Sequence, residues 1–253
     1  MFQPASLKGD SPTPIDEKIR KKYLFIYFII ILMSLIPSVL FEYYYFILLW
    51  KPDLRIYFFL LSPLNIISVI YILQCSALII SKIALTLCNL LHYPKEGVFE
   101  RNIKDKDYLF WNIRNIIKKW PLYISATNPF PWLKNRFTLR FFGVKIGKNC
   151  ICDNAWISSE FIEVGNNVII GMGSTILSFG MDHNKFFLRK ITIEDNVTIG
   201  AKCVILPGAH LQENVKVSAH SYVNFEQNLR ENGIYKGHPV ELKKEDHTGE
   251  VNE

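Results

Sequence analysis

Residues 193–222 read IEDNVT-IGAKCV-ILPGAH-LQENVK-VSAHSY, consecutive hexads in which every first residue is aliphatic. A helix would repeat such residues about every 3.6 positions and a strand about every 2 positions, so a strict period of six fits neither element alone. The period is typical of a chain that turns a corner every six residues and stacks its coils, with one side chain per hexad pointing inward.

The period occurs in two runs, and its inward positions are Ile146, Cys152, Ser158, Val164, Ile170 and Ile176 in the first run and Ile193, Ile199, Ile205, Leu211, Val217 and Val223 in the second. The 17 positions from Ile176 to Ile193 are not a multiple of six, so we expect the chain to leave the coil between the runs. An excursion from a rigid scaffold is where functional residues tend to lie.

The hexads IGKNCI, VGNNVI, IGMGST, IEDNVT and IGAKCV resemble the [LIV]-G-x-x-x-x repeats of left-handed β-helix acyltransferases. Residues 237–240, GHPV, resemble the G-x-P-A sequence that closes the sugar O-acetyltransferase branch of that family. The resemblance implies a left-handed parallel β-helix over residues 140–244 and an acyl-transfer activity. The same coil also occurs in nucleotidyltransferase tails and γ-class carbonic anhydrases.

Hydrophobic residues make up 49% of the 253 residues and concentrate between Tyr23 and Leu91. The net charge of +6 is mild, and its basic residues flank the apolar block, which favours a membrane surface and not nucleic acid as the partner. The five cysteines form no disulfide framework. Cys152 and Cys203 fall on or near inward positions, where a small buried thiol is expected.

Two apolar runs, residues 23–50 and 56–80, the second continuing more weakly to Leu91, are joined by the polar turn Lys51–Arg55. About twenty apolar residues span a hydrocarbon core of about 30 Å, so we predict a two-helix membrane hairpin over residues 23–92. Buried helices of a soluble protein are the alternative. A signal peptide does not fit, because no small-residue cleavage site is present and a second apolar run follows.

The basic residues predict the topology. They lie before the first run and after the second, with only Lys51 and Arg55 between: Lys18, Arg20, Lys21 and Lys22, then Lys82, Lys95, Arg101, Lys104 and Lys106. The positive-inside rule therefore places the tail 1–22 and the β-helix on the cytoplasmic side, in the compartment that holds coenzyme A.

Residues 93–139 form a predicted connecting segment, in which residues 93–106 are polar and read as a loop. Residues 107–120 have a helical stripe of Leu109, Phe110, Ile113, Ile116, Ile117 and Trp120, opposite Asn112, Arg114, Lys118 and Lys119. Such a helix either lies in the membrane interface with its basic groups toward lipid phosphates or caps the open end of the coil. Residues 128–132 should end it, and the polar tail 245–253 should be disordered.

The excursion at residues 178–190 reads SFGMDHNKFFLRK and contains His183, the candidate catalytic base. A histidine near neutral pKa suits removal of a proton from a hydroxyl or amine during acyl transfer. The resemblance supports this role, because the family's catalytic histidine lies in the loop before the later coils. Asp182, which precedes it, could orient the imidazole.

The resemblance also implies the other site residues. An asparagine on a neighbouring subunit's coil matches Asn154, and a glutamate after the base matches Glu194, although glycine is usual there. The donor is a coenzyme A thioester in a groove between subunits of a homotrimer. Backbone groups of the later coils would hold its pantetheine arm, and lysines would bind its phosphates: Gly200, Ala201, Ser218 and Ala219, then Lys236 and Lys244.

The sequence thus predicts an α + β protein, an N-terminal transmembrane helical hairpin followed by a left-handed parallel β-helix. The predicted activity is O- or N-acyl transfer, with acetyl-coenzyme A as co-substrate, no metal, and a small-molecule or lipid-linked sugar or envelope precursor as acceptor. One alternative is a non-catalytic trimeric platform. Another is a γ-carbonic-anhydrase-like zinc enzyme using His183, His210 and His220, whose hexad positions differ. The order of segments, membrane helices followed by an amphipathic helix and then hexads, also resembles the membrane-linked hexapeptide regions of peptide-synthesising adenylation enzymes. In that case a carrier protein would supply the acyl group.

Overall fold

The computed structural model describes residues 18–128, 133–152, 154–182 and 184–245. Their contacts divide the chain into two compact units. The helical unit comprises residues 18–93 and 112–127, and the coil unit comprises residues 94–111 and 128–245. The predicted connecting segment 93–139 is therefore shared between the two units and does not form a unit of its own.

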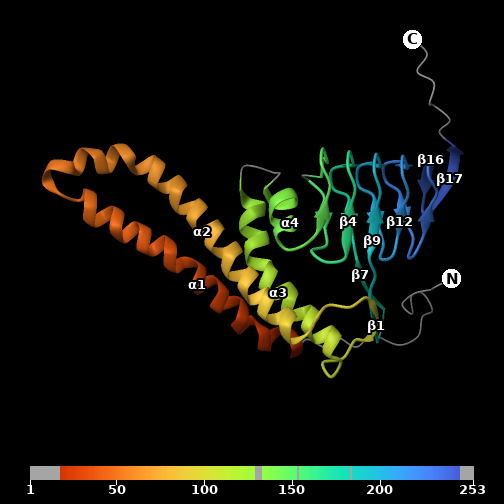
Figure 1. The fold of residues 1–253 in the computed structure, drawn as a ribbon, viewed down its shortest axis with the longest axis horizontal. Helices are drawn as coiled ribbons and strands as arrows, with labels where there is room; N and C mark the ends of the chain where they lie inside the picture. The colour runs from red at the N-terminus through yellow and green to blue at the C-terminus, as the bar shows by residue number, and fades with distance from the viewer. Residues whose placement is uncertain (1–17, 129–132, 153, 183, 246–253) are drawn as a thin grey trace, which may run out of the picture. The chain divides into compact units, whose positions relative to one another are not determined.

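The helical unit is built on an antiparallel pair, α1 (Lys18–Leu49) and α2 (Arg55–Leu91), joined by a turn that contains the short 3-10 helix η2 (Pro52–Leu54) (Figure 1). At 1.5 Å per residue the two helices are about 48 and 55 Å long. Both are long and apolar enough to cross a membrane. Pro37 and Pro63 lie inside the helices.

Polar groups link the two helices on their inner faces. The Asn65 side-chain amide donates to the Glu42 carboxylate at 2.9 Å, and the Ser76 hydroxyl donates to the Ser34 carbonyl at 2.6 Å. Large aliphatic and aromatic side chains instead cover the outside, among them Phe25, Phe28, Val39, Leu60 and Ile66, each more than half exposed. This polarity is the reverse of that in a water-soluble helix pair.

Helix α3 (Lys106–Thr127) begins in the coil unit and continues in the helical unit. The Asp105 carboxylate caps it by accepting from the backbone N–H groups of Asp107 and Tyr108. The predicted exposed basic face is wrong in part, because the side chains of Arg114 and Lys118 are 2% and 1% exposed. Lys119 is exposed as predicted.

The coil unit contains three parallel sheets whose strands stack one coil above the next (Figure 1). Sheet 1 consists of β2 (Lys145–Ile146), β4 (Ile162–Val164), β9 (Ile191–Ile193), β12 (His210–Leu211) and β15 (Asn228–Leu229). Sheet 2 consists of β5 (Ile169–Ile170), β10 (Thr198–Ile199), β13 (Lys216–Val217), β16 (Gly233–Gly237) and the antiparallel β17 (Val240–Glu245). Sheet 3 consists of β3 (Trp156–Ile157), β6 (Thr175–Ile176), β11 (Val204–Ile205) and β14 (Tyr222–Val223).

The hexad prediction of the core is confirmed. All twelve predicted inward side chains are buried, none of them more than 8% exposed. A second inward column, not predicted, follows four positions after each aliphatic residue and consists of small or branched side chains: Val197, Cys203, Ala209, Val215 and Ser221. The period also continues for two further hexads through Leu229 and Tyr235, both buried.

Asparagines make the corner between sheets 1 and 2. The asparagine there has a positive φ, between 54° and 60°, in each of five successive coils: Asn149, Asn167, Asn196, Asn214 and Asn232. This left-handed conformation is more accessible to asparagine than to other residues that carry a Cβ. Their side-chain amides also bond along the stack, at 3.3 Å from Asn149 to Asn167 and 3.0 Å from Asn214 to Asn232.

A short helical segment covers the first coil. The π-helical turn η3 (Leu133–Thr138) runs into α4 (Leu139–Phe141), and Leu139 is buried beside the first strand (Figure 1). The Arg140 guanidinium donates to the carbonyl groups of Ile146 and Gly147. The segment formed by η3 and α4 is therefore bonded to the first coil.

The excursion forms an antiparallel hairpin of β7 (Phe179–Asp182) and β8 (Lys185–Leu188). Strand β1 (Gly97–Glu100) pairs with β8 to complete a three-stranded sheet, called here the hairpin sheet. The prediction of a loop over residues 93–106 is wrong for this strand. The pairing joins segments almost ninety residues apart, which no local pattern could indicate.

Replacement of Ile170, which is 3% exposed in the core of the coil, by alanine should destabilise the protein by about 2–5 kcal/mol, because it leaves a cavity between coils. Its neighbour Ile169 is 43% exposed, so Ile169→Ala is the matched control and should cost less than about 1 kcal/mol. Chemical unfolding of the detergent-purified variants measures both. Equal losses would contradict the inward assignment.

Candidate active site

The hairpin sheet leaves the coil at the corner between sheets 3 and 1, after β6 and before β9. Asp182 and Lys185 face each other across its tip in the strand register. His183, the predicted base, falls outside the described residues. The described residues before and after it, Asp182 and Asn184, lie at the end of this hairpin.

Backbone contacts from the segment around β1 hold both ends of the hairpin. At the tip, the Arg101 N–H donates to the Asn184 carbonyl at 2.7 Å. At the base, the Lys190 N–H donates to the Glu96 carboxylate at 2.8 Å. The hairpin therefore has fixed hydrogen bonds at both ends and is not a free loop.

Aromatic side chains pack on both faces of the hairpin. On one face the Trp111 ring of α3 lies 4.5 Å from the Phe186 ring and 4.9 Å from the Phe179 ring, centroid to centroid. On the other face Phe187 contacts Phe225 of the coil at 5.6 Å. Sequence reasoning missed this packing. The alternation in GVFE and KFFL was its only signal.

The residues predicted to hold the donor stack at the corner between sheets 2 and 3. Gly200 and Ala201 follow β10, and Ser218 and Ala219 follow β13 one coil later. A Cβ on Gly200 would lie 2.3 Å from the Ala219 nitrogen, so only glycine allows the coils to approach this closely. The structure thus brings these four residues together as one column of backbone.

Lys236 lies at the next level of this column. The Ser218 N–H donates to the carbonyl of Tyr235 on β16, and the exposed Lys236 follows directly. Lys244 is on β17, whose backbone pairs with β16 at Ile234. Asn154 is at the same corner in the first coil, where its carbonyl accepts from the Gly173 N–H at 3.0 Å and its side chain is exposed.

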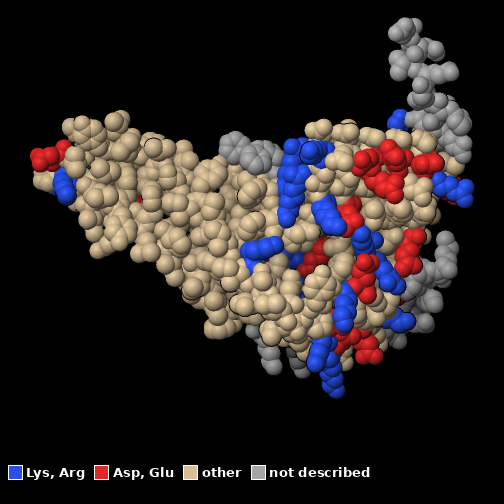
Figure 2. Space-filling view, viewed as in Figure 1, with Lys and Arg blue, Asp and Glu red and all other residues tan. Residues whose placement is uncertain are grey.

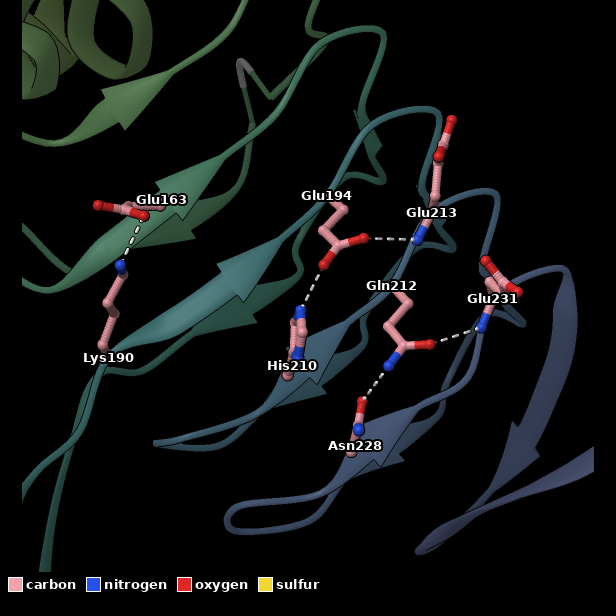
Figure 3. Close-up of polar contacts among 8 residues, drawn as sticks. All are labelled: Glu163, Lys190, Glu194, His210, Gln212, Glu213, Asn228 and Glu231. Carbon is pink, nitrogen blue, oxygen red and sulfur yellow. Dashed lines mark hydrogen bonds and ion pairs between the residues drawn. The ribbon is translucent and has the colours of Figure 1, made fainter.

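Glu194 lies elsewhere, at the corner between sheets 1 and 2. Its carboxylate contacts the His210 imidazole Nε2 at 2.6 Å and accepts from the Glu213 N–H at 3.1 Å (Figure 3). Both side chains are partly exposed. Within one chain, Glu194 therefore lies at a different corner from Asn154 and the four residues predicted to hold the donor.

The outer face of sheet 1 carries a row of polar contacts. Glu163 bonds to Lys145 at 2.7 Å and to Lys190 at 2.6 Å (Figure 3 shows the second pair). The hydrogen bond from Lys145, followed by that from Lys190, lowers the pKa of the Glu163 carboxyl. A shallow groove of about 450 Å³ runs along this face between Lys145 and Glu213.

The described residues contain no group of three or more histidine, cysteine, aspartate or glutamate side chains able to hold a metal ion. His210 is on β12 of sheet 1, and His220 is in the turn after β13 between sheets 2 and 3. The five cysteines are free, and burial raises the pKa of the Cys203 thiol. The inward placement predicted for Cys152 and Cys203 is confirmed.

Stacked hexads in three parallel sheets, with a hairpin added at one corner, define a hexapeptide-repeat coil protein. The family model described as bacterial transferase hexapeptide (six repeats) matches residues 190–224. A Bacillus subtilis (strain 168) protein called "Putative acetyltransferase YvoF" is 30% identical over 125 residues, which cover 48% of this chain and 72% of YvoF. The chain belongs to the family of hexapeptide-repeat transferases.

Two solved structures are similar to the coil. The hexapeptide-repeat acetyltransferase VCA0836 of Vibrio cholerae is 16% identical with a TM-score of 0.44, over 51% of this chain and 88% of that chain. A maltose O-acetyltransferase from Clostridium difficile 630 is 22% identical with a TM-score of 0.40, over 51% of this chain and 83% of that chain.

Glu163→Gln should lower the free energy of unfolding by about 1 kcal/mol at neutral pH, since it removes a carboxylate shared by two lysines. The pKa of Glu163 is lowered in the folded state, so its contribution is present above the unfolded value of about 4.3 and is lost as the pH falls through the folded value. The wild type and the variant should therefore converge once the pH falls below the folded value. Unfolding midpoints across this pH range test it, with the exposed Glu241→Gln as control.

Proposed function

We propose that this protein is a membrane-anchored acyltransferase that moves an acyl group, acetyl in the simplest case, from a coenzyme A thioester to a hydroxyl or amine. The acceptor would be a sugar or envelope precursor. The observation that carries the proposal is the hairpin, which a rigid coil of hexapeptide-transferase type presents at one corner with both its ends hydrogen-bonded. In this proposal the coil winds left-handed.

His183 acts as the general base at the tip of the hairpin. It removes the proton from the acceptor O–H or N–H as that atom attacks the thioester carbonyl carbon. The tetrahedral intermediate then collapses, the carbon–sulfur bond breaks, and the proton passes to the departing thiolate of coenzyme A. The products are the acylated acceptor and free coenzyme A, so the reaction needs no redox partner and no metal.

The donor lies along the column at the corner between sheets 2 and 3. Its pantetheine arm follows the backbone at Gly200, Ala201, Ser218 and Ala219, where neighbouring coils stack closely. Lys236 and Lys244 bind the phosphates at the end of that column. The position of the exposed Lys236 one coil beyond Ser218 supports this direction.

A homotrimer completes the site. Asn154 and the donor column lie at one end of the sheet 3 strands, whereas the hairpin leaves the coil at the other end. A neighbouring copy that presents its corner between sheets 2 and 3 to the hairpin would bring together His183 of one subunit with Asn154 and the donor of the next. Glu194, at the corner between sheets 1 and 2, lies at neither of these two corners and has no part in this arrangement.

The helical unit anchors the enzyme in the membrane. Its aliphatic side chains face outward while Ser34, Asn65 and Ser76 bond between helices, which suits hydrocarbon and not water as the solvent. Buried helices of a soluble protein would show the opposite pattern. The lysines and arginines that flank the two runs support a cytoplasmic coil, in the compartment where coenzyme A is available.

His183→Ala should lower the rate of thiol release from acetyl-coenzyme A by about 100-fold or more, because it removes the base. The assay uses detergent-purified protein and a panel of sugar and amine acceptors. Asn184→Ala is the matched control, since Asn184 contributes a backbone carbonyl to the hairpin and its side chain is exposed. Full turnover by His183→Ala would leave the acyltransferase activity in place and would contradict the role of His183 as the base. No turnover and no coenzyme A binding in the wild type would favour the platform or a carrier-protein donor.

Lys236→Ala should raise the KM for acetyl-coenzyme A about tenfold and leave kcat nearly unchanged, because a phosphate contact binds the ground state and the transition state alike. Lys216 on β13 is an exposed lysine of the same sheet, and Lys216→Ala should leave both constants as they are. Initial rates at varied donor concentration distinguish the two variants. A fall in kcat with an unchanged KM would contradict a role in donor binding.

A further inference from the structure

One end of the helical unit carries a cluster of aromatic rings around a basic group. At the turn between α1 and α2, the Arg55 guanidinium lies 5.3 Å from the centre of the Trp50 ring. Phe46 stacks on the same ring at 5.3 Å, and Phe58 meets it edge-on at 5.2 Å. The Tyr45 hydroxyl donates to the Phe58 carbonyl at 2.6 Å. These five residues are called the tip cluster.

A second cluster of the same kind lies near the start of α1. The Lys119 ammonium is 6.0 Å from the centre of the Tyr27 ring. Trp120 of α3 meets Tyr27 edge-on at 6.3 Å and stacks with Tyr123 at 6.3 Å. The Trp120 indole N–H donates to the Ser34 hydroxyl at 3.0 Å, which fixes α3 against α1. Tyr27, Lys119, Trp120 and Tyr123 are called the base cluster.

The two clusters are one bilayer apart. Tyr27 precedes Tyr45 by 18 residues and Trp50 by 23 residues on one helix, which corresponds to about 27 and 35 Å. The hydrocarbon core of a membrane is about 30 Å thick, and amphipathic rings concentrate at its two boundaries. On α2 no charged residue occurs between Arg55 and Lys82, a stretch of similar length. Figure 2 shows the visible face of this unit uncharged between its two ends.

We propose that the tip cluster and the base cluster lie in the two opposite interfaces of a bilayer, and that the second half of α3, residues 112–127, lies in the interface of the base cluster. The proposal rests on the membrane anchoring proposed above and goes beyond it. It fixes the depth of α1 and α2 and adds a third membrane-bound helix. Lys119 then reaches the lipid phosphates from the edge of the aromatic cluster.

Lipid, and not a second copy of the chain, fits the surface between the clusters. Exposed apolar side chains lie there along one broad face of α1 and over a wider arc of α2: Phe28, Ile29, Leu32, Met33, Leu35, Ile36, Val39 and Leu40 on α1, and Phe59, Leu60, Leu61, Leu64, Ile66 and Ile67 on α2. A protein partner covers one stripe of a helix, whereas lipid covers every side that the protein leaves open. Glu42 lies at membrane depth in this arrangement, and its hydrogen bond from Asn65 offsets part of the cost of placing it there.

Spin-label depth measurements on the full chain test the proposal. Cys75 is the exposed cysteine, and the other four are buried, so Cys75→Ser provides a background without reactive thiols. Nitroxides are attached at Val39→Cys, Tyr123→Cys and Lys148→Cys, in vesicles of phosphatidylcholine and phosphatidylglycerol. Val39 and Tyr123 are 62% and 61% exposed, so any difference between them reports lipid and not burial by protein. Lys148, exposed on the coil unit, is the aqueous reference.

The label at position 39 should show high accessibility to oxygen and loss of accessibility to a polar nickel chelate. The label at position 123 should have oxygen and chelate accessibilities between those at position 39 and those at position 148, as expected at the depth of the lipid phosphates. Equal accessibilities at positions 123 and 148 would overturn the interfacial placement of α3 but would leave the membrane anchor in place. Equal accessibilities at positions 123 and 39 would overturn the proposed depth of α3 in the bilayer. Aqueous behaviour at position 39 would remove the membrane anchor itself.

Discussion

The close stacking of corners is the constraint on which the coil unit depends. Three sheets can pack around one narrow core only if the chain turns a corner every six residues. Each corner needs a backbone conformation that most residues avoid. The asparagine column between sheets 1 and 2 supplies that conformation in five coils. Gly200 supplies the contact between neighbouring coils at another corner, where a side chain would collide with the Ala219 backbone. The inward aliphatic residues stabilise the stack only because the corners hold them in register.

A rigid stack of this kind offers few places for an insertion. An insertion within a strand would shift every later hexad, whereas an insertion at a corner leaves both the preceding and the following coils in register. The hairpin sheet occupies one such corner, and β9 still pairs with β4 below it and β12 above it. Trp111 and Phe225 pack on opposite faces of the hairpin and hold it from both sides.

The sequence was sufficient to predict the coil, but it did not predict the contacts of the segments that pack on the coil. The twelve inward residues could be predicted because each hexad repeats one environment, so a local rule applies to all of them. The pairing of β1 with β8 could not, since neither GVFE nor KFFL specifies its partner. The partner of Glu194 could not be predicted either. Its contact with His210 joins two neighbouring coils and depends on how strands β9 and β12 align. Arg114 and Lys118 were misplaced for the same reason, since helical periodicity reports a face but not what covers it.

The two units of this chain apply opposite rules of polarity. In the coil unit aliphatic side chains are inside and charged pairs such as Glu163 with Lys190 are outside, as water requires. In the helical unit hydroxyl and amide groups bond between the helices beside a few buried aliphatic residues such as Ile30 and Leu78, and many large aliphatic side chains are exposed. Helix α3 belongs to both units, so one helix must satisfy both rules in turn. Its first turns present Trp111 to the aromatic hairpin, and its later turns place the indole N–H of Trp120 on a serine of α1. Along α3 the contacts therefore change from aromatic packing in the coil unit to a polar hydrogen bond in the helical unit.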